Sequence, residues 1–160
     1  MRLLLLSVGR AKTGPERDLV DRYIGRASAA GRSLGFSSIE LREIDESRAR
    51  RPQDRKLEEA KAIRAALGNS AQIIACDETG KTITSADFAA RLGHARDSGV
   101  ATLGLVIGGP DGLDPAFRAE AQLAIAFGAM TWPHQLARVL AAEQIYRATT
   151  ILSGHPYHRI

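Results

Sequence analysis

The sequence predicts an α/β domain in which helices flank a largely parallel β-sheet. Short apolar runs of strand length alternate with amphipathic stretches of helical length from one end of the chain to the other, as parallel sheets with helical crossovers require. A proline or a capping sequence precedes several of the amphipathic stretches, which marks them as helix starts. The 160 residues contain no internal repeat or linker, so we expect one domain, residues 1–160, with its own core.

The first half of the chain contains two predicted strands and two predicted helices. Residues 3–8 form an apolar run typical of a buried strand, and residues 38–44 alternate as a shorter strand does. The first helix begins at Thr13-Gly14-Pro15, because proline is favoured at the first helical position. Pro52 begins the second helix in the same way. The apolar residues that recur at helical spacing are Leu19, Val20, Tyr23, Ile24 and Ala27 in the first helix and Leu57, Ala60 and Leu67 in the second.

In the second half of the chain, predicted strands and helices again alternate. A strand over residues 71–77 is predicted to end in a turn at residues 78–81. Thr84 and Asp87 have the spacing of a capping box, and Gly99 ends the helix that follows. Three further segments are a strand over 103–107, a short helix over 115–121 and a strand over 123–127.

The last helix begins at Pro133, ends near Gly154 and is apolar around most of its circumference. At about 100° per residue, its larger apolar side chains face several directions; they are Leu136, Val139, Leu140, Ile145, Ile151 and Leu152. A helix of this kind needs cover on more than one side. The sheet supplies one side, and in so short a chain a second copy is the simplest cover for the other. The sequence therefore predicts a homodimer.

Composition excludes several classes of protein. With 44% hydrophobic and 25% charged residues, wholesale disorder is excluded. No apolar run reaches the ~18 residues of a membrane helix, no secretory signal is recognisable, and Cys76, the single cysteine, cannot form an internal disulfide. We expect a cytoplasmic protein.

The net charge of +4 and the 18 arginines against 4 lysines are compatible with nucleic-acid binding without proving it. Residues 45–64 carry seven cations and five acids, and a solvated helix face is the favoured interpretation over a dedicated phosphate patch.

Three segments at the expected ends of strands are candidates for a ligand site, because open α/β sheets bind ligands there. They are residues 76–81, 108–112 and 130–134. The turn Gly108-Gly109-Pro110-Asp111-Gly112 lacks the dinucleotide and phosphate-loop patterns, and alone it indicates a tight turn. Cys76 is expected to act as a small buried apolar residue rather than as a nucleophile, and Asp77 is expected to cap a turn. No His and Cys cluster has metal-ligand spacing, so we expect no metal.

Titratable side chains gather towards the C-terminus. His134 lies in the first turn of the last helix, Arg138 lies four residues on, and Glu143 and Arg147 form another four-residue pair. Residues 154–159 then place two histidines, a tyrosine and an arginine at the chain end. Chain ends are usually dispensable, so this richness indicates a functional site.

These residues resemble a known family. The strings Thr131-Trp132-Pro133-His134-Gln135-Leu136-Ala137-Arg138, Glu143-Gln144-Ile145-Tyr146-Arg147-Ala148 and Pro156-Tyr157-His158-Arg159 are similar to the ribosomal RNA large subunit methyltransferase H family of the SPOUT superfamily. Val8-Gly9-Arg10, Asp77-Glu78-Thr79-Gly80-Lys81 and Ile107-Gly108-Gly109 fall in the expected order.

The resemblance implies a SPOUT-type α/β fold with a C-terminal trefoil knot, a homodimer, S-adenosyl-L-methionine as methyl donor and N3 of a pseudouridine in 23S rRNA as acceptor, recognised on assembled ribosomes. No membrane or DNA partner is implied. The implied cofactor contacts are Cys76, Gly108, Gly109, Phe127, Gly128, Ala129, Met130, Thr131 and Trp132. The implied residues around the RNA base are His134, Arg138, Arg147, Tyr157, His158 and Arg159.

For the proton on N3, two routes stay open: His158 or His134 removes it, or an arginine stabilises the anion. Two rival functions also follow from the residues. The first is a non-catalytic RNA-binding protein on the same scaffold, and the second is a small nucleotide hydrolase, for which no nucleophile–base pair is visible.

Overall fold

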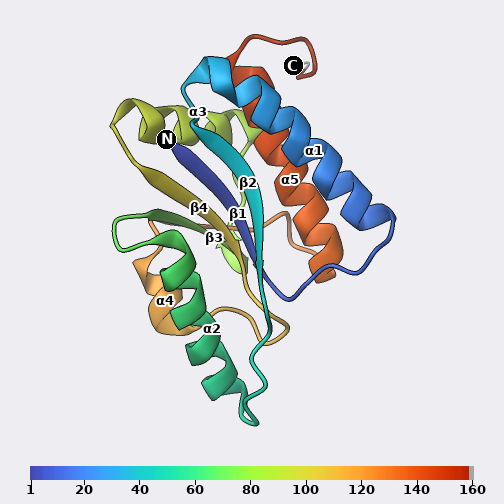
Figure 1. Ribbon diagram of the computed structural model, residues 1–160, viewed down its shortest axis with the longest axis vertical. Coiled ribbons are helices and arrows are strands. Elements are labelled where there is room, and N and C mark those ends of the chain that lie inside the picture. The colour runs from blue at the N-terminus through green and yellow to red at the C-terminus, as the bar shows by residue number, and fades with distance from the viewer. Residues whose placement is uncertain (159–160) are drawn as a thin grey trace.

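The computed structural model describes residues 1–158, and in this part of the chain strands and helices alternate (Figure 1). The strands are β1 (Arg2–Val8), β2 (Ser38–Ile44), β3 (Gln72–Lys81), β4 (Thr102–Ile107) and β5 (Leu123–Ile125). The helices are α1 (Pro15–Gly31), α2 (Pro52–Leu67), α3 (Ser85–Asp97), α4 (Pro115–Glu120) and α5 (His134–Leu152), with a 3₁₀ turn η1 (Arg32–Leu34) after α1.

The five strands form one sheet in the order β2-β1-β4-β3-β5, and every neighbouring pair is parallel. All five strands therefore end at the same edge of the sheet. The predicted α/β class with a largely parallel sheet is confirmed. The trefoil knot stays a prediction of the resemblance.

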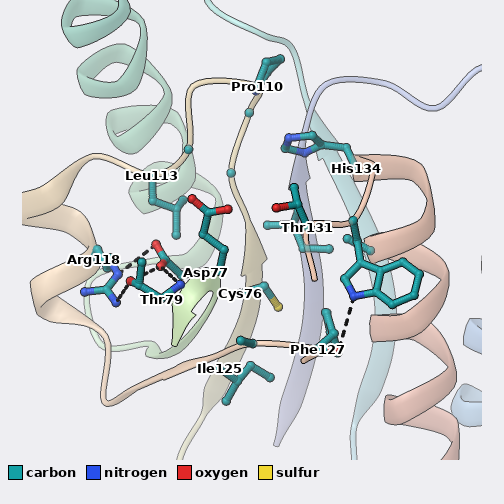
Figure 2. Close-up of a pocket in the computed structure, with 18 of the residues that line it drawn as sticks. Cys76, Asp77, Thr79, Pro110, Leu113, Arg118, Ile125, Phe127, Thr131 and His134 are labelled. Atoms are coloured by element: carbon teal, nitrogen blue, oxygen red, sulfur yellow. Dashed lines mark hydrogen bonds and ion pairs between the residues drawn. The ribbon is translucent and has the colours of Figure 1, made fainter. Parts of the chain in front are cut away.

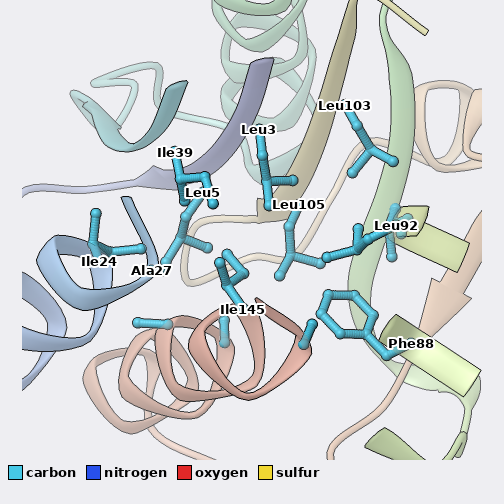
Figure 3. Packing of buried hydrophobic residues seen from close by; sticks show 14 of the residues in the cluster. Leu3, Leu5, Ile24, Ala27, Ile39, Phe88, Leu92, Leu103, Leu105 and Ile145 are labelled. Carbon is cyan, nitrogen blue, oxygen red and sulfur yellow. The ribbon is translucent and has the colours of Figure 1, made fainter. Parts of the chain in front are cut away.

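Side chains of β1 alternate between two buried clusters, so both faces of the sheet are covered. Leu3 and Leu5 face the helices α1, α3 and α5, and Figure 3 shows them packed with Ile24, Phe88 and Ile145 from those helices. Leu4, Leu6 and Val8 face the other way, where α2 and Phe117 of α4 cover them. Two helical layers thus enclose a sheet that is apolar on both sides.

Local sequence features predict where the helices begin. Pro15 and Pro52 occupy the first turn of α1 and α2, and Thr84 and Asp87 form the predicted capping box of α3. Gly99 follows α3 with a φ of 75°, a left-handed conformation in which glycine carries little strain.

Two strand boundaries were predicted wrongly. Residues 78–81 do not form a closing turn, because β3 continues through an irregularity after Cys76 until Lys81 pairs with Ile125. The strand predicted over 123–127 ends at Ile125, and the chain beyond it turns into the loop that precedes α5. Both differences lie at the edge of the sheet where the candidate ligand segments meet.

The expectation that α5 needs a second copy of the protein to cover its apolar side chains was also wrong. Within the chain, α5 packs against both α1 and α3 as well as the sheet, and Figure 1 shows α1 lying alongside it. Ile145 is fully buried and Val139, Leu140, Ile151 and Leu152 are partly buried, whereas Leu136 is 40% exposed. The apolar circumference of α5 is therefore covered mostly by its own chain.

Among the helices of residues 1–158, none combines the length and the apolar character needed to cross a membrane.

Candidate active site

A cavity of about 550 Å³ opens at the edge of the sheet where the strands end, a size typical of small-molecule sites. The three candidate segments meet there: residues 76–79 from β3, residues 107–113 after β4, and residues 125–134 between β5 and α5. Figure 2 shows these segments surrounding the opening, with Cys76, Leu113 and His134 on different sides of it. Parallel strands bring these distant parts of the sequence together, as the sequence predicted.

The wall of the cavity combines apolar side chains with exposed main chain. Ile107, Leu113, Ile125 and Phe127 supply the apolar surface. The turn of residues 108–112 is closed by a hydrogen bond from the amide of Gly112 to the carbonyl of Gly109, 2.9 Å long.

Glycine is needed in this turn for reasons of space. A Cβ on Gly108 would lie 2.9 Å from the carbonyl carbon of Gly112, and one on Gly109 would lie 2.9 Å from the Glu59 carboxylate. Any larger residue at either position would push the turn out of its place at the cavity wall.

A polar network stiffens the β3 side of the cavity. The Asp77 carboxylate accepts hydrogen bonds from the amide and hydroxyl of Thr79, at 2.9 and 2.6 Å, and these bonds lie within β3 rather than at the predicted turn. Arg118 of α4 lies 2.9 Å from Asp77 and donates to the Thr79 hydroxyl at 2.8 Å (Figure 2). Burial alone raises the pKa of Asp77, but the bonds from Thr79 and the Arg118 charge hold it below its ordinary value. Asp77 is therefore ionised at neutral pH.

Cys76 contributes a neutral thiol to the cavity. Burial, assisted by the neighbouring Asp77 carboxylate, raises its pKa to about 12. Because the thiolate is the reactive form, Cys76 is an inert wall residue at neutral pH, as expected from the sequence.

The loop before α5 is held by its own side chains. Nε1 of Trp132 donates to the carbonyl of Phe127 at 3.2 Å, which closes residues 127–132 into a compact curve beside the cavity. His134 lies in the first turn of α5 and lines the opening. Its Nδ1 is buried and has no hydrogen-bond partner among residues 1–158.

The C-terminal residues form a second cluster around Glu143. Its carboxylate accepts from Arg147 at 2.5 Å and from the Tyr157 hydroxyl at 3.1 Å. Nδ1 of His158 lies 3.4 Å from the Arg147 guanidinium, and the Tyr157 ring packs against Tyr146 with centroids 4.7 Å apart. Burial, with the Tyr23 hydroxyl and Glu143, raises the pKa of Tyr157 to about 12, so its phenol is neutral.

This cluster and the cavity lie at opposite ends of α5. Arg147 lies thirteen positions after His134, which is about 20 Å along a helix, and Figure 1 shows the segment that follows α5 at the far end of that helix. Within one chain, the residues that are predicted to surround the RNA base are therefore not brought together.

Arg138 belongs to neither group. Its side chain is 5% exposed, and it donates to the carbonyls of Val8 and Gly9 at 2.8 Å each and to Glu43 at 3.2 Å. It ties α5 to the end of β1 and does not line the cavity.

Most of the implied cofactor residues do line the cavity, and they are Cys76, Gly108, Gly109, Phe127, Gly128, Met130, Thr131 and Trp132. Ala129 lies in the same loop but not in the lining, and Arg159 lies outside the described residues.

Sequence reasoning missed Leu113, Arg118 and Ile125. Ile125 lay in the middle of the strand predicted over 123–127, so its place at the strand end was not anticipated, and nothing local marks Arg118.

Comparisons with known proteins agree with this geometry. Residues 1–158 match the model of a family described as predicted SPOUT methyltransferase. Among curated proteins, the chain is 59% identical to ribosomal RNA large subunit methyltransferase H of Beijerinckia indica and 57% identical to that of Methylocella silvestris, each over 99% of both chains.

Among solved structures, a probable methyltransferase from Bordetella pertussis has the same fold, with a TM-score of 0.52 and 16% identity over 92% of this chain and 96% of that one. A probable methylase family protein from Haemophilus influenzae also reaches 0.52, with 12% identity over 99% and 70% of the two chains. The sheet, the cavity at its edge and the full-length similarity lead to one conclusion: the chain belongs to the ribosomal RNA large subunit methyltransferase H family of SPOUT methyltransferases.

Proposed function

We propose that this protein is an S-adenosylmethionine-dependent methyltransferase that methylates N3 of a pseudouridine in 23S rRNA on assembled ribosomes, working as a cytoplasmic homodimer. The observation that carries the proposal is the cavity at the end of the sheet, where the three segments that match the family's pattern meet. Relatives at 54 to 59% identity bear the name of a large-subunit rRNA methyltransferase, and SPOUT methyltransferases use S-adenosylmethionine.

The residues of the cavity fit this methyl donor. A nucleoside with an amino-acid arm needs an apolar slot for its base and main-chain or side-chain partners for its polar ends. Ile107, Ile125 and Phe127 provide the slot, and the turn at Gly108 and Gly109 brings main chain against it without side chains in the way. When bound, the donor would supply an electrophilic methyl group on a sulfonium, whose S–CH₃ bond breaks as the N–CH₃ bond forms and leaves a neutral thioether.

The chain must then orient the base and manage the N3 proton. His134 lines the cavity and has an unpartnered nitrogen, so it is placed to accept the proton or to hold a carbonyl of the base. The alternatives are His158 as the base and Arg147 as the group that stabilises the anion. Tyr157, with its neutral phenol, would stack on a base that has left its helical stack.

A second copy would complete the site. Within one chain, Arg147 lies about 20 Å from His134 along α5, so a C-terminal tail (residues 153–158) that serves the cavity must come from a partner. Apolar side chains beside the cavity are exposed, with Met130 at 74%, Trp132 at 40% and Leu136 at 40%, and a partner would cover them. The exposed side chains of Met130, Trp132 and Leu136 therefore support the dimer, whereas the rest of the apolar surface of α5 does not.

Mass mapping of 23S rRNA from cells with and without the protein tests the function. We expect the loss of one methyl group from one pseudouridine, restored by the unaltered chain and not by Ala126→Trp, which fills the cavity from its wall. Purified protein should restore the methyl group on intact ribosomal particles more readily than on free rRNA. Identical rRNA masses in both strains would overturn the proposal.

A further inference from the structure

The connection between β2 and α2, residues 45–51, carries three arginines whose side chains the fold leaves open to solvent. Arg48, Arg50 and Arg51 are exposed, and none of them forms an ion pair with an acid in the part of the chain that the structure describes. Because β2 is parallel to the other strands, this connection leaves the sheet at the same edge as the cavity.

The backbone of the connection is held in place. The amide of Ser47 donates to the Glu59 carboxylate at 3.0 Å. The Arg55 guanidinium donates to the carbonyls of Ala49 and Arg50, each at 3.1 Å. These bonds fix the backbone from which the exposed side chains of Arg48, Arg50 and Arg51 project.

The same anchors join the connection to the cavity. Arg55 pairs with Asp111 through two hydrogen bonds of 2.6 and 3.1 Å, and Asp111 lies in the glycine turn that lines the cavity. Glu59 is 5% exposed and lies against Gly109 of that turn. The three arginines are therefore presented from the rim of the candidate active site.

Three acidic residues nearby are engaged by other groups, whereas Glu46 and Asp54 have no cationic partner among residues 1–158. Asp45 accepts from Arg10 at 2.6 Å, Glu58 from the Ser47 hydroxyl and Asp111 from Arg55, while the Glu46 carboxylate lies over Gly9. Three unpaired arginines against two unpaired carboxylates leave this segment with an excess of positive charge, carried by guanidinium groups that match the oxygens of phosphates in geometry and charge.

We infer that Arg48, Arg50 and Arg51 form an arginine arm that binds the phosphate backbone of the RNA substrate and holds it over the cavity. This inference rests on the proposed function for the identity of the RNA. Phosphate contacts position a nucleic acid without reading its sequence, so the arm strengthens binding of the ribosomal particle and leaves the choice of nucleotide to the cavity.

The test compares two variants that each lose three positive charges. The arm variant carries Arg48→Gln, Arg50→Gln and Arg51→Gln. The control carries Arg22→Gln, Arg32→Gln and Arg91→Gln, three exposed arginines on α1, η1 and α3 that likewise lack an ion pair among residues 1–158. Binding to ribosomal particles is measured by co-sedimentation over a range of salt, and S-adenosylmethionine binding by calorimetry.

We expect the arm variant to bind ribosomal particles at least about tenfold more weakly, with the slope of log affinity against log salt reduced by about 2, as three lost phosphate contacts require. The control should stay within about twofold of the unaltered protein. Both variants should keep the affinity for S-adenosylmethionine, since no altered side chain lines the cavity.

Equal binding by the arm and control variants overturns the inference, and so does failure of the unaltered protein to bind ribosomal particles. If the unaltered protein binds them but leaves their pseudouridines unmethylated, the proposed function fails, while the comparison of the two variants still decides the arm.

Discussion

Arg138 supports α5 from a buried position next to the cavity. Its guanidinium supplies donors for two carbonyls at the end of β1 and for Glu43, which also pairs with Arg17. Burial lowers the pKa of Arg138, but from so high a starting value the group stays charged at neutral pH. The residue therefore determines how the first turn of α5, with His134, sits against the sheet.

Replacing Arg138 with methionine should destabilise the protein by about 3 kcal/mol, because the carbonyls of Val8 and Gly9 lose the Arg138 donor and Glu43 loses one of its two arginine partners. Denaturant unfolding measures this loss. Arg10→Met is the matched control, because the Arg10 and Asp45 side chains are 70% and 74% exposed and solvent screening leaves such a pair with little effect on stability. Equal effects of the two substitutions would mean that Arg138 does not hold α5 to β1.

At the scale of elements, the sequence predicts well wherever a local feature fixes a boundary. Pro15, Pro52 and the pair Thr84 and Asp87 mark helix starts correctly. It fails at residues 78–81, where Glu-Thr-Gly-Lys has turn composition but Lys81 pairs with Ile125. That pairing joins segments more than forty positions apart in the chain, and no local pattern reports it.

Gly80 is the residue that allows β3 and β5 to approach at this irregularity. A Cβ there would lie 2.5 Å from the carbonyl carbon of Ile125, so Gly80→Ala should destabilise the protein by about 1–3 kcal/mol and weaken S-adenosylmethionine binding, because Ile125 lines the cavity. Gly25→Ala provides the contrast. Gly25 lies within α1 with nothing within 4 Å of the added Cβ, and alanine there should stabilise the protein by about 0.5–1 kcal/mol. Thermal unfolding and calorimetry measure both variants, and a stable Gly80→Ala would refute the close approach.

At the scale of the whole molecule, the sequence predicts the cavity better than the site around the RNA base. Cys76, the glycine turn and the loop before α5 each follow a strand, and parallel strands bring such segments to one edge. His134 and the residues of the tail follow no such rule. A helix of known length separates them, and only the arrangement of two chains decides whether they meet.

Complementation between a cavity variant and a tail variant, each first shown to be inactive on its own, tests that arrangement. Ala126→Trp fills the cavity but keeps the tail, and His158→Ala alters the tail but keeps the cavity. If each site combines one chain's cavity with its partner's tail, a mixed dimer has one site with both parts intact. Random mixing in equal amounts makes about half of the dimers mixed, so about a quarter of all sites should be active. Methylation of ribosomal particles after co-refolding should reach about a quarter of the unaltered protein's rate, whereas sites contained within single chains, or a protein that stays monomeric, would give no recovery at all.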